Sequence, residues 1–170
     1  MQVLETDRLA LRYFRTDDVE FVVRLLNEPS FIEHIGDKGV RTVEEASQYL
    51  LDGPLDSYER FGYGLNMVEL KETGEPIGMC GLVRRENLDD ADIGYAFLEQ
   101  HWSKGYATES AEAILIHARD TLGLDRTVAI VTPENHSSIN LLEKIGLTFE
   151  GMIRMSDDDE ELKFFVSDVQ

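Results

Sequence analysis

Short stretches of the chain alternate apolar and polar residues, which is the pattern of strands that bury one face. In the first of them, residues 8–14, the side chains of Leu9, Leu11 and Tyr13 lie on the same side. Turn-forming residues separate later stretches, as Glu-Thr-Gly does at 72–74. The predicted strands are residues 8–14, 61–70, 76–85, 91–98, 128–131, 148–155 and 160–169. The second, third and fourth of these should form an antiparallel meander.

Other stretches carry apolar residues three and four positions apart, which is the spacing of one helix face. Thr16 is expected to cap the first helix, which ends before Pro29. A second helix, near residues 43–51, lies among glycines and a proline in a region typical of substrate-facing loops. A third is predicted over residues 105–122. A fourth carries an apolar stripe at Ile139, Leu142 and Ile145, and Gly146 caps its end.

The length of 170 residues predicts a single domain, 1–170, with one core and no interdomain linker. Sixteen Lys and Arg against 34 Asp and Glu give a net charge of -18. Such a field repels phosphate backbones, so we do not expect nucleic acid as a partner. It attracts cations, which suits amines, polyamines or a basic protein tail. Acidity also serves solubility alone in many cytosolic proteins.

Several classes of protein are disfavoured by what the sequence lacks. Cys80 is the single cysteine, so we expect neither an intrachain disulfide nor a cysteine metal cluster. The four histidines are scattered without ligand spacing, and we predict no metal site. Neither a signal peptide nor an apolar stretch of membrane-spanning length is present, so we expect a cytoplasmic protein without membrane contact.

The most informative segment is residues 92–108, in which a predicted strand runs into a glycine-containing turn that opens a helix. The first backbone N–H groups of a helix have no partner within it, and with the helix dipole they bind anions such as pyrophosphate. Gly105 and Ala107 lack the bulk that would block a close approach. The segment indicates a phosphate-bearing cofactor, although glycine also serves such turns for conformational reasons alone.

Three segments in this order resemble the GNAT N-acetyltransferase superfamily, and several features resemble its RimJ/RimL-like branch. They are Thr-Asp-Arg-Leu-Ala-Leu-Arg at 6–12, Trp-Ser-Lys-Gly-Tyr-Ala-Thr-Glu at 102–109, and residues 135–147, which begin Asn-His-Ser-Ser. The resemblance covers nearly the whole chain. It implies the acyl-CoA N-acyltransferase fold, of α/β (α+β) class: a mixed, mainly antiparallel sheet of about seven strands with helices on both faces. Acetyl-CoA would enter where the fourth and fifth predicted strands part.

The resemblance also implies which residues bind acetyl-CoA. Segment 102–109 corresponds to the pyrophosphate loop, and Asn135 in the second CoA motif would bond the pantetheine arm or orient a water. A backbone N–H of the splayed strand, at about Phe97 or Leu98, would stabilise the oxyanion of the reaction. The expected cofactor-binding residues are Phe97, Leu98, Ser103, Lys104, Gly105, Tyr106, Ala107, Thr108, Asn135 and Ser138.

For catalysis, the resemblance places a general base at Asp92, a short acid that would act through a water, with Glu99 in reserve. Many superfamily members carry a tyrosine general acid in the last helix, but Leu142 stands there in this chain. A departing thiolate with a pKa of about 8.5 needs little help, so the Ser138 hydroxyl is our candidate acid. Both acids can equally be solvated surface groups, and Ser138 and Asn135 can equally be helix caps.

The implied reaction is attack of a neutral primary amine on the acetyl thioester. In the RimJ/RimL-like branch that amine is often the N-terminus of a ribosomal protein, and polyamines or other small amines are the alternative acceptors. A non-catalytic acyl-CoA-binding sensor is the alternative from another class, because the usual tyrosine is missing. The sequence does not choose between a monomer and a homodimer.

Overall fold

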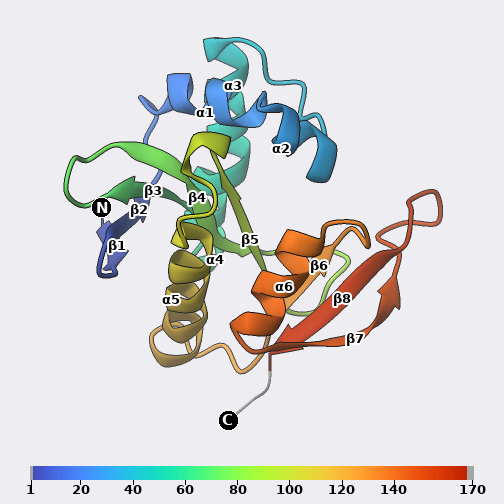
Figure 1. The fold of residues 1–170 in the computed structure, drawn as a ribbon. Coiled ribbons are helices and arrows are strands. Elements are labelled where there is room, and N and C mark those ends of the chain that lie inside the picture. Colours follow the sequence, from blue (N-terminus) through green and yellow to red (C-terminus); the bar gives the residue numbers. More distant parts are fainter. Residues whose placement is uncertain (1, 168–170) are drawn as a thin grey trace.

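One eight-stranded sheet organises the protein (Figure 1), and the computed structural model describes residues 2–167 of it. The strands lie in the order β1-β2-β3-β4-β5-β6-β8-β7, and every neighbouring pair is antiparallel except β5 with β6. The mixed, mainly antiparallel sheet is therefore confirmed. The strands are β1 (Gln2–Glu5), β2 (Leu9–Tyr13), β3 (Leu65–Leu70), β4 (Pro76–Val83), β5 (Ala91–Phe97), β6 (Thr127–Val131), β7 (Leu147–Ile153) and β8 (Leu162–Ser167).

The structure contains one strand more than the seven predicted, and this additional strand is β1. It is four residues long, its two end residues are exposed, and it pairs with β2 at the edge of the sheet. So short a segment offers too few positions for a period-two pattern to stand out. At the other end of the chain, β8 covers most of the predicted strand 160–169, of which residues 168 and 169 lie outside the described residues.

Helices cover both faces of the sheet, as expected. On one face, α5 (Tyr106–Asp120) and α6 (His136–Lys144) pack over a core that includes Ile93. On the other, a second buried cluster includes residues of the first three helices together with Met79 of β4. Within the described residues no helix is both long and apolar enough to cross a membrane. The helices of the second face are α1 (Val19–Leu26), α2 (Pro29–His34), α3 (Val43–Leu50) and α4 (Asp56–Phe61).

Thr16 does not cap the first helix, so that prediction is wrong. Helix α1 begins at Val19 with Asp18 in the cap position, and no side chain caps it. The Asp18 carboxylate is instead bound by the Arg12 guanidinium, through two hydrogen bonds of 2.9 Å, and by the N–H of Arg15 at 2.7 Å. A partly buried ion pair between strand and helix therefore fixes this corner, and tertiary contact overrides the local capping preference.

The helix predicted over 43–51 is longer than expected. A capping box at Thr42 and Glu45 starts it, but a π-helical turn, η1 (Leu51–Leu55), carries the chain past Pro54 directly into α4. A π-turn accommodates a proline because it already breaks the regular hydrogen-bond pattern. The chain leaves α4 at Gly62, which is left-handed with φ of 80°. The strand predicted from residue 61 consequently begins later, at Leu65.

Strands β5 and β6 separate soon after they meet. They pair in parallel only at Ala91 with Thr127 and at Asp92 with Val128. Beyond these positions β5 stays with β4 as far as Phe97, while β6 pairs with β8 on its other side. Two strand edges are thereby left without a partner in the middle of the sheet. These are the fourth and fifth predicted strands, which the resemblance expected to part.

Candidate active site

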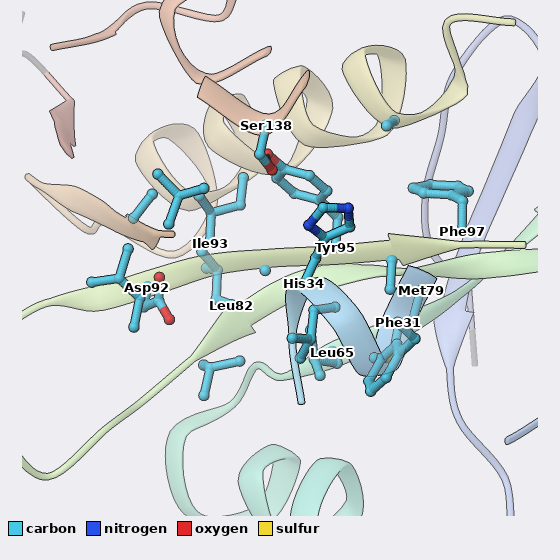
Figure 2. Close-up of a pocket in the computed structure, with 18 of the residues that line it drawn as sticks. Phe31, His34, Leu65, Met79, Leu82, Asp92, Ile93, Tyr95, Phe97 and Ser138 are labelled. Atoms are coloured by element: carbon cyan, nitrogen blue, oxygen red, sulfur yellow. Dashed lines mark hydrogen bonds between the residues drawn. The ribbon is translucent and has the colours of Figure 1, made fainter. Parts of the chain in front are cut away.

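A cleft of about 830 Å³ lies where β5 and β6 part (Figure 2). Residues of β5 line its middle, and the N-terminal turns of α5 and α6 close one side. Residues of α2 and α4 reach it from the opposite face of the sheet. The cleft thus passes through the sheet, and a donor and an acceptor can enter it from opposite faces.

The free edge of β5 is defined by one hydrogen bond. The N–H of Leu98 donates to the carbonyl of Ile77 at 3.0 Å, so this group is committed to the sheet. Because hydrogen-bonding directions alternate along a strand, the backbone groups of Phe97 point to the other side. The Phe97 carbonyl accepts there from the Trp102 indole at 2.9 Å. Of the two expected oxyanion donors, the N–H of Phe97 therefore faces the opening and that of Leu98 does not.

The turn before α5 leaves several backbone N–H groups without a partner in the helix. Ser103 and Gly105 are both left-handed, with φ of 64° and 83°, and α5 follows at once. The first helical hydrogen bond is from Glu109 N–H to the Gly105 carbonyl, and no side chain caps the end. The N–H groups of residues 106–108 are thus available to an anion. Ser103 and residues 105–108 line the cleft, whereas Lys104 is exposed outside its lining.

The N-terminal segment anchors this turn. The Glu109 carboxylate accepts from the backbone N–H of Arg8 at 3.0 Å, from Arg8 Nε at 2.7 Å, and from the Thr6 hydroxyl. Although burial alone would raise the pKa of Glu109, the bonds from Thr6 and Arg8 hold it below its usual value. The Arg8 guanidinium also lies 4.5 Å from the centre of the Tyr106 ring. These contacts give a physical reason for the Thr-Asp-Arg segment: it holds the first turn of α5 against the sheet.

Asp92 lies at the point where β5 and β6 begin to part. Its side chain is buried, Oδ2 accepts from Arg85 Nε at 2.8 Å, and Oδ1 has no partner among the described residues. Burial raises the pKa of Asp92 to about 6 against the opposing effect of the Arg85 guanidinium. A carboxylate with such a pKa is ionised at neutral pH and is still basic enough to accept a proton.

Glu99, the reserve candidate, is not brought to the cleft. It is exposed in the short 3-10 turn η2 (Glu99–His101), and it does not line the cleft. Its N–H donates to the Glu28 carboxylate at 3.0 Å, which ties this turn to the segment before α2. Its position fits the solvated interpretation of this acid.

Asn135 and Ser138 lie at the start of α6. Asn135 Oδ1 accepts the N–H of Ser138 at 3.3 Å, so Asn135 does cap this helix, and its amide nitrogen stays available to a ligand. The Ser138 hydroxyl lies 2.7 Å from the Tyr95 hydroxyl, with either one as donor (Figure 2). Leu142, one helical turn further on, is buried.

Tyr95 also belongs to this group, although the sequence suggested for it only a place in the lining of the acceptor tunnel or in the packing, and no catalytic role. Burial raises its pKa to about 12, so the phenol remains protonated. The alternation along β5 places Tyr95 on the same face as Phe97, but no sequence signal shows that the start of α6 packs against it. A phenol therefore does reach this part of the cleft, although from β5 and not from the position of Leu142.

The opposite end of the cleft is formed by side chains from the second face. Phe31 and His34 of α2 reach it together with Leu65 and Met79 of the sheet (Figure 2). Helix α2 was not predicted, and Pro29 at its first position is the signal that could have shown it. The region expected to contain substrate-facing loops thus contributes helical residues to the cleft.

Comparison with known proteins shows the family of this chain. Residues 8–148 match the acetyltransferase (GNAT) domain family. The chain belongs to this family and is an acetyltransferase. It is 32% identical over 175 residues to p20 of Bacillus licheniformis, an uncharacterized N-acetyltransferase, covering 99% of this chain and 93% of that one.

Solved structures share the fold over the full length. An acetyltransferase from Agrobacterium tumefaciens superposes with a TM-score of 0.82 at 28% identity, covering 98% of this chain and 93% of that one. RimL, a ribosomal L7/L12 alpha-N-protein acetyltransferase solved with coenzyme A, has a TM-score of 0.86 at 18% identity, covering 99% and 98%. The second likeness shows the fold alone.

Proposed function

We propose that this protein transfers the acetyl group of acetyl-CoA to a primary amine in the cleft between β5 and β6. The observation that carries the proposal is one arrangement: the free N–H of Phe97 lies between an anion-binding turn on one side and the buried Asp92 carboxylate on the other. Each of the three groups supplies a function that acyl transfer requires.

Acetyl-CoA binding is assigned to backbone groups. The turn 103–108 holds the pyrophosphate through N–H groups, with the exposed Lys104 able to reach a phosphate from outside. The edge of β5 at Phe97 and Leu98, together with Asn135 and Ser138 at the start of α6, holds the pantetheine arm. Two unpaired strand edges suit an amide-containing chain, because such a chain can complete their hydrogen bonding.

Asp92 accepts the proton that the acceptor ammonium must lose, directly or through a water. For an α-amino group with a pKa of about 8, transfer to a base with a pKa of about 6 costs roughly 2.7 kcal/mol. For a lysine amine with a pKa of about 10.4 it costs roughly 6 kcal/mol. Deprotonation therefore costs less for α-amino groups and other weakly basic amines than for alkyl amines.

Ser138 donates to the departing thiolate, and Tyr95 orients it. The hydroxyl pair is 2.7 Å apart, and both groups are neutral at physiological pH. The leaving thiolate has a pKa of about 8.5, so hydrogen bonding gives modest assistance and a strong acid is not required. This arrangement accounts for catalysis without a tyrosine at Leu142.

We assign the protein to the RimJ/RimL-like branch, with the N-terminal amine of a protein or a small amine as acceptor. The segments at 6–12, 102–109 and 135–147 support this assignment, and the smaller cost of deprotonating a weakly basic amine suits an α-amine. A non-catalytic acyl-CoA sensor is disfavoured by the buried base at the strand junction, which binding of acyl-CoA alone would not need.

The test is release of free thiol from acetyl-CoA in the presence of a basic N-terminal peptide, spermidine or amino acids. Amine-dependent release is the expected result, and Asp92→Ala should abolish most of it. Tight CoA binding by thermal shift together with no release for any amine would overturn the proposed function in favour of a sensor.

A further inference from the structure

The charge of the cleft differs from the charge of the molecule. Four of the 16 Lys and Arg residues line it, but only three of the 34 Asp and Glu residues do. A random sample of this chain would contain twice as many acids as bases. The lining residues with charge are Lys38, Arg60, Arg84, Arg85, Asp52, Asp56 and Asp92.

The acids of the cleft already have partners. Asp92 is bound by Arg85 at 2.8 Å and Asp56 by Arg60 at 3.3 Å. The Asp52 carboxylate accepts from the amide of Gln48 at 2.8 Å. Each of the three therefore has one oxygen engaged within the protein, and the second oxygen of Asp92 is left for the acceptor amine.

Two cationic groups of the cleft keep unused capacity. Among the described residues, Lys38 has no carboxylate partner, and Arg85 uses only its Nε, so both of its terminal nitrogens remain free. Both line the same cleft. Desolvation and then the charge of Arg85 lower the pKa of Lys38, although the residue as a whole is exposed. Unrelieved repulsion between two cations in a cleft is reduced when an anion binds between them.

These cations lie next to the proposed base. Arg85 contacts Asp92 directly, and Lys38 lies in the connection between α2 and α3, on the acceptor side of the sheet. An acceptor amine that reaches Asp92 therefore lies beside Arg85 and shares the cleft with Lys38. The anion-binding turn of α5 is a separate site, formed from the other side of the cleft.

We propose that the acceptor is an amine that also carries an anionic group, a carboxylate or a phosphate, and that Lys38 and Arg85 bind this group while the amine faces Asp92. The inference rests on the proposed acetyl transfer and specifies its acceptor. In that reaction the nitrogen lone pair forms the C–N bond and the C–S bond breaks. Asp92 takes one proton from the ammonium before the attack, and the nitrogen loses its second proton to solvent as the C–S bond breaks. The sulfur leaves as a thiolate that accepts a hydrogen bond from Ser138 and takes its proton from solvent.

The experiment compares matched acceptors by thiol release from acetyl-CoA. The pairs are amino acids with their amides and ethanolamine phosphate with ethanolamine, and spermidine is included as a polycation. Rates are expressed per neutral amine, because an anionic substituent also changes the amine pKa. We expect kcat/KM at least tenfold higher for the anionic member of one pair, and the pair that responds tells carboxylate from phosphate.

A pair of variants assigns the effect to the cleft. Lys38→Gln should reduce the anionic preference about tenfold or more. Arg41→Gln is the matched control, because it removes the same charge three residues away from a side chain that is exposed and paired with Asp37 at 2.7 Å. The preference should be retained in this control. Equal loss in both variants would show a general effect of charge and overturn the inference.

The failures of the two proposals are distinguishable. Thiol release with equal kcat/KM for anionic and neutral members, or with spermidine preferred, overturns the anion site and leaves acetyl transfer intact. If no amine gives release, acetyl transfer fails, and the anion site is tested by binding. With CoA present, an N-acetylated amino acid should then raise the melting temperature more than its amide does, and equal shifts would overturn the site.

Discussion

The two sides of the cleft are built in different ways. The proposed cofactor side consists of backbone groups that one local turn arranges, with Ser103 and Gly105 in left-handed conformations before α5. The proposed acceptor side consists of side chains from distant segments, such as Lys38 and Asp92. A backbone site depends on a short motif, whereas a side-chain site depends on the whole fold. The first can be found in the sequence, and the second becomes visible only in three dimensions.

The difference between the two sides of the cleft is expected to be largest on substitution of Asp92. On the acceptor side a single side chain should carry the chemistry, so Asp92→Asn should lower kcat about 100-fold or more while CoA affinity changes little. In the wild type, kcat/KM should fall as pH decreases through about 6, because the protonated base cannot accept a proton. The asparagine variant should lack this acidic limb.

A matched control for this change is Asp90→Asn. Asp90 lies two residues earlier in the chain, is paired with Arg126 at 3.5 Å, and does not line the cleft. Its activity should stay within about twofold of wild type. If both variants lose activity to the same extent, or if Asp92→Asn stays within about threefold, Asp92 is not the base.

The raised pKa of Asp92 should also make the free energy of unfolding depend on pH. The folded pKa of Asp92, about 6, lies above its ordinary value of 3.8, so folding favours the protonated form. The stabilising contribution is full below pH 3.8 and is lost as pH rises through 6. Relative to wild type, Asp92→Asn should therefore gain about 2 kcal/mol in free energy of unfolding between pH 4.5 and pH 7.5. Urea unfolding at the two pH values measures this, and a constant difference would contradict it.

On the cofactor side, Gly105→Ala and Gly123→Ala form a matched pair. Both glycines are left-handed at ends of α5, so both substitutions should cost about 1 kcal/mol of stability. Of the two positions, only at 105 would the new Cβ approach another group, the Arg8 guanidinium at 3.2 Å. This contact would disturb the turn whose backbone N–H groups we propose to bind the phosphates. CoA affinity measured by calorimetry should fall about tenfold for Gly105→Ala alone. An unchanged affinity would exclude this turn as the phosphate site.

The smallest effects are expected where the two sides meet, at the Tyr95 and Ser138 hydroxyls. Tyr95→Phe and Ser138→Ala should each lower kcat roughly three- to tenfold, since assistance to a thiolate is modest. The double variant should be little worse than either single one, because the two groups act as a unit. Fully multiplicative losses would show that Tyr95 does not act through Ser138, and losses below threefold in both would remove their catalytic role.

Local signals predicted much of the fold, including the turn and the helix ends that we propose to bind acetyl-CoA. The meander, the start of α5 and the cap at Asn135 follow from alternation, glycine and capping preferences within a few residues. The errors arise where distant contacts decide. Asp18 binds Arg12 instead of leaving the cap to Thr16. Pro54 is accommodated within a continuous run of helical turns.

The acceptor side was less predictable for the same reason. The net charge suggested a polycationic acceptor, but the charge of a whole chain does not give the charge of its cleft. Tyr95 meets Ser138 across 43 residues, and Lys38 lines the same cleft as Arg85 across 47, so no spacing rule could join them. The sequence gives the residue types, and the packing of α2 and α6 on opposite faces determines which of them meet.

The central claim is that the cleft catalyses acetyl transfer with Asp92 as base. It is tested most directly by measuring thiol release from acetyl-CoA for wild type and Asp92→Asn across matched anionic and neutral amines. The account predicts amine-dependent release by wild type, highest with an anionic amine, and a loss of about 100-fold in the variant. Release that is equally fast in both proteins would contradict it.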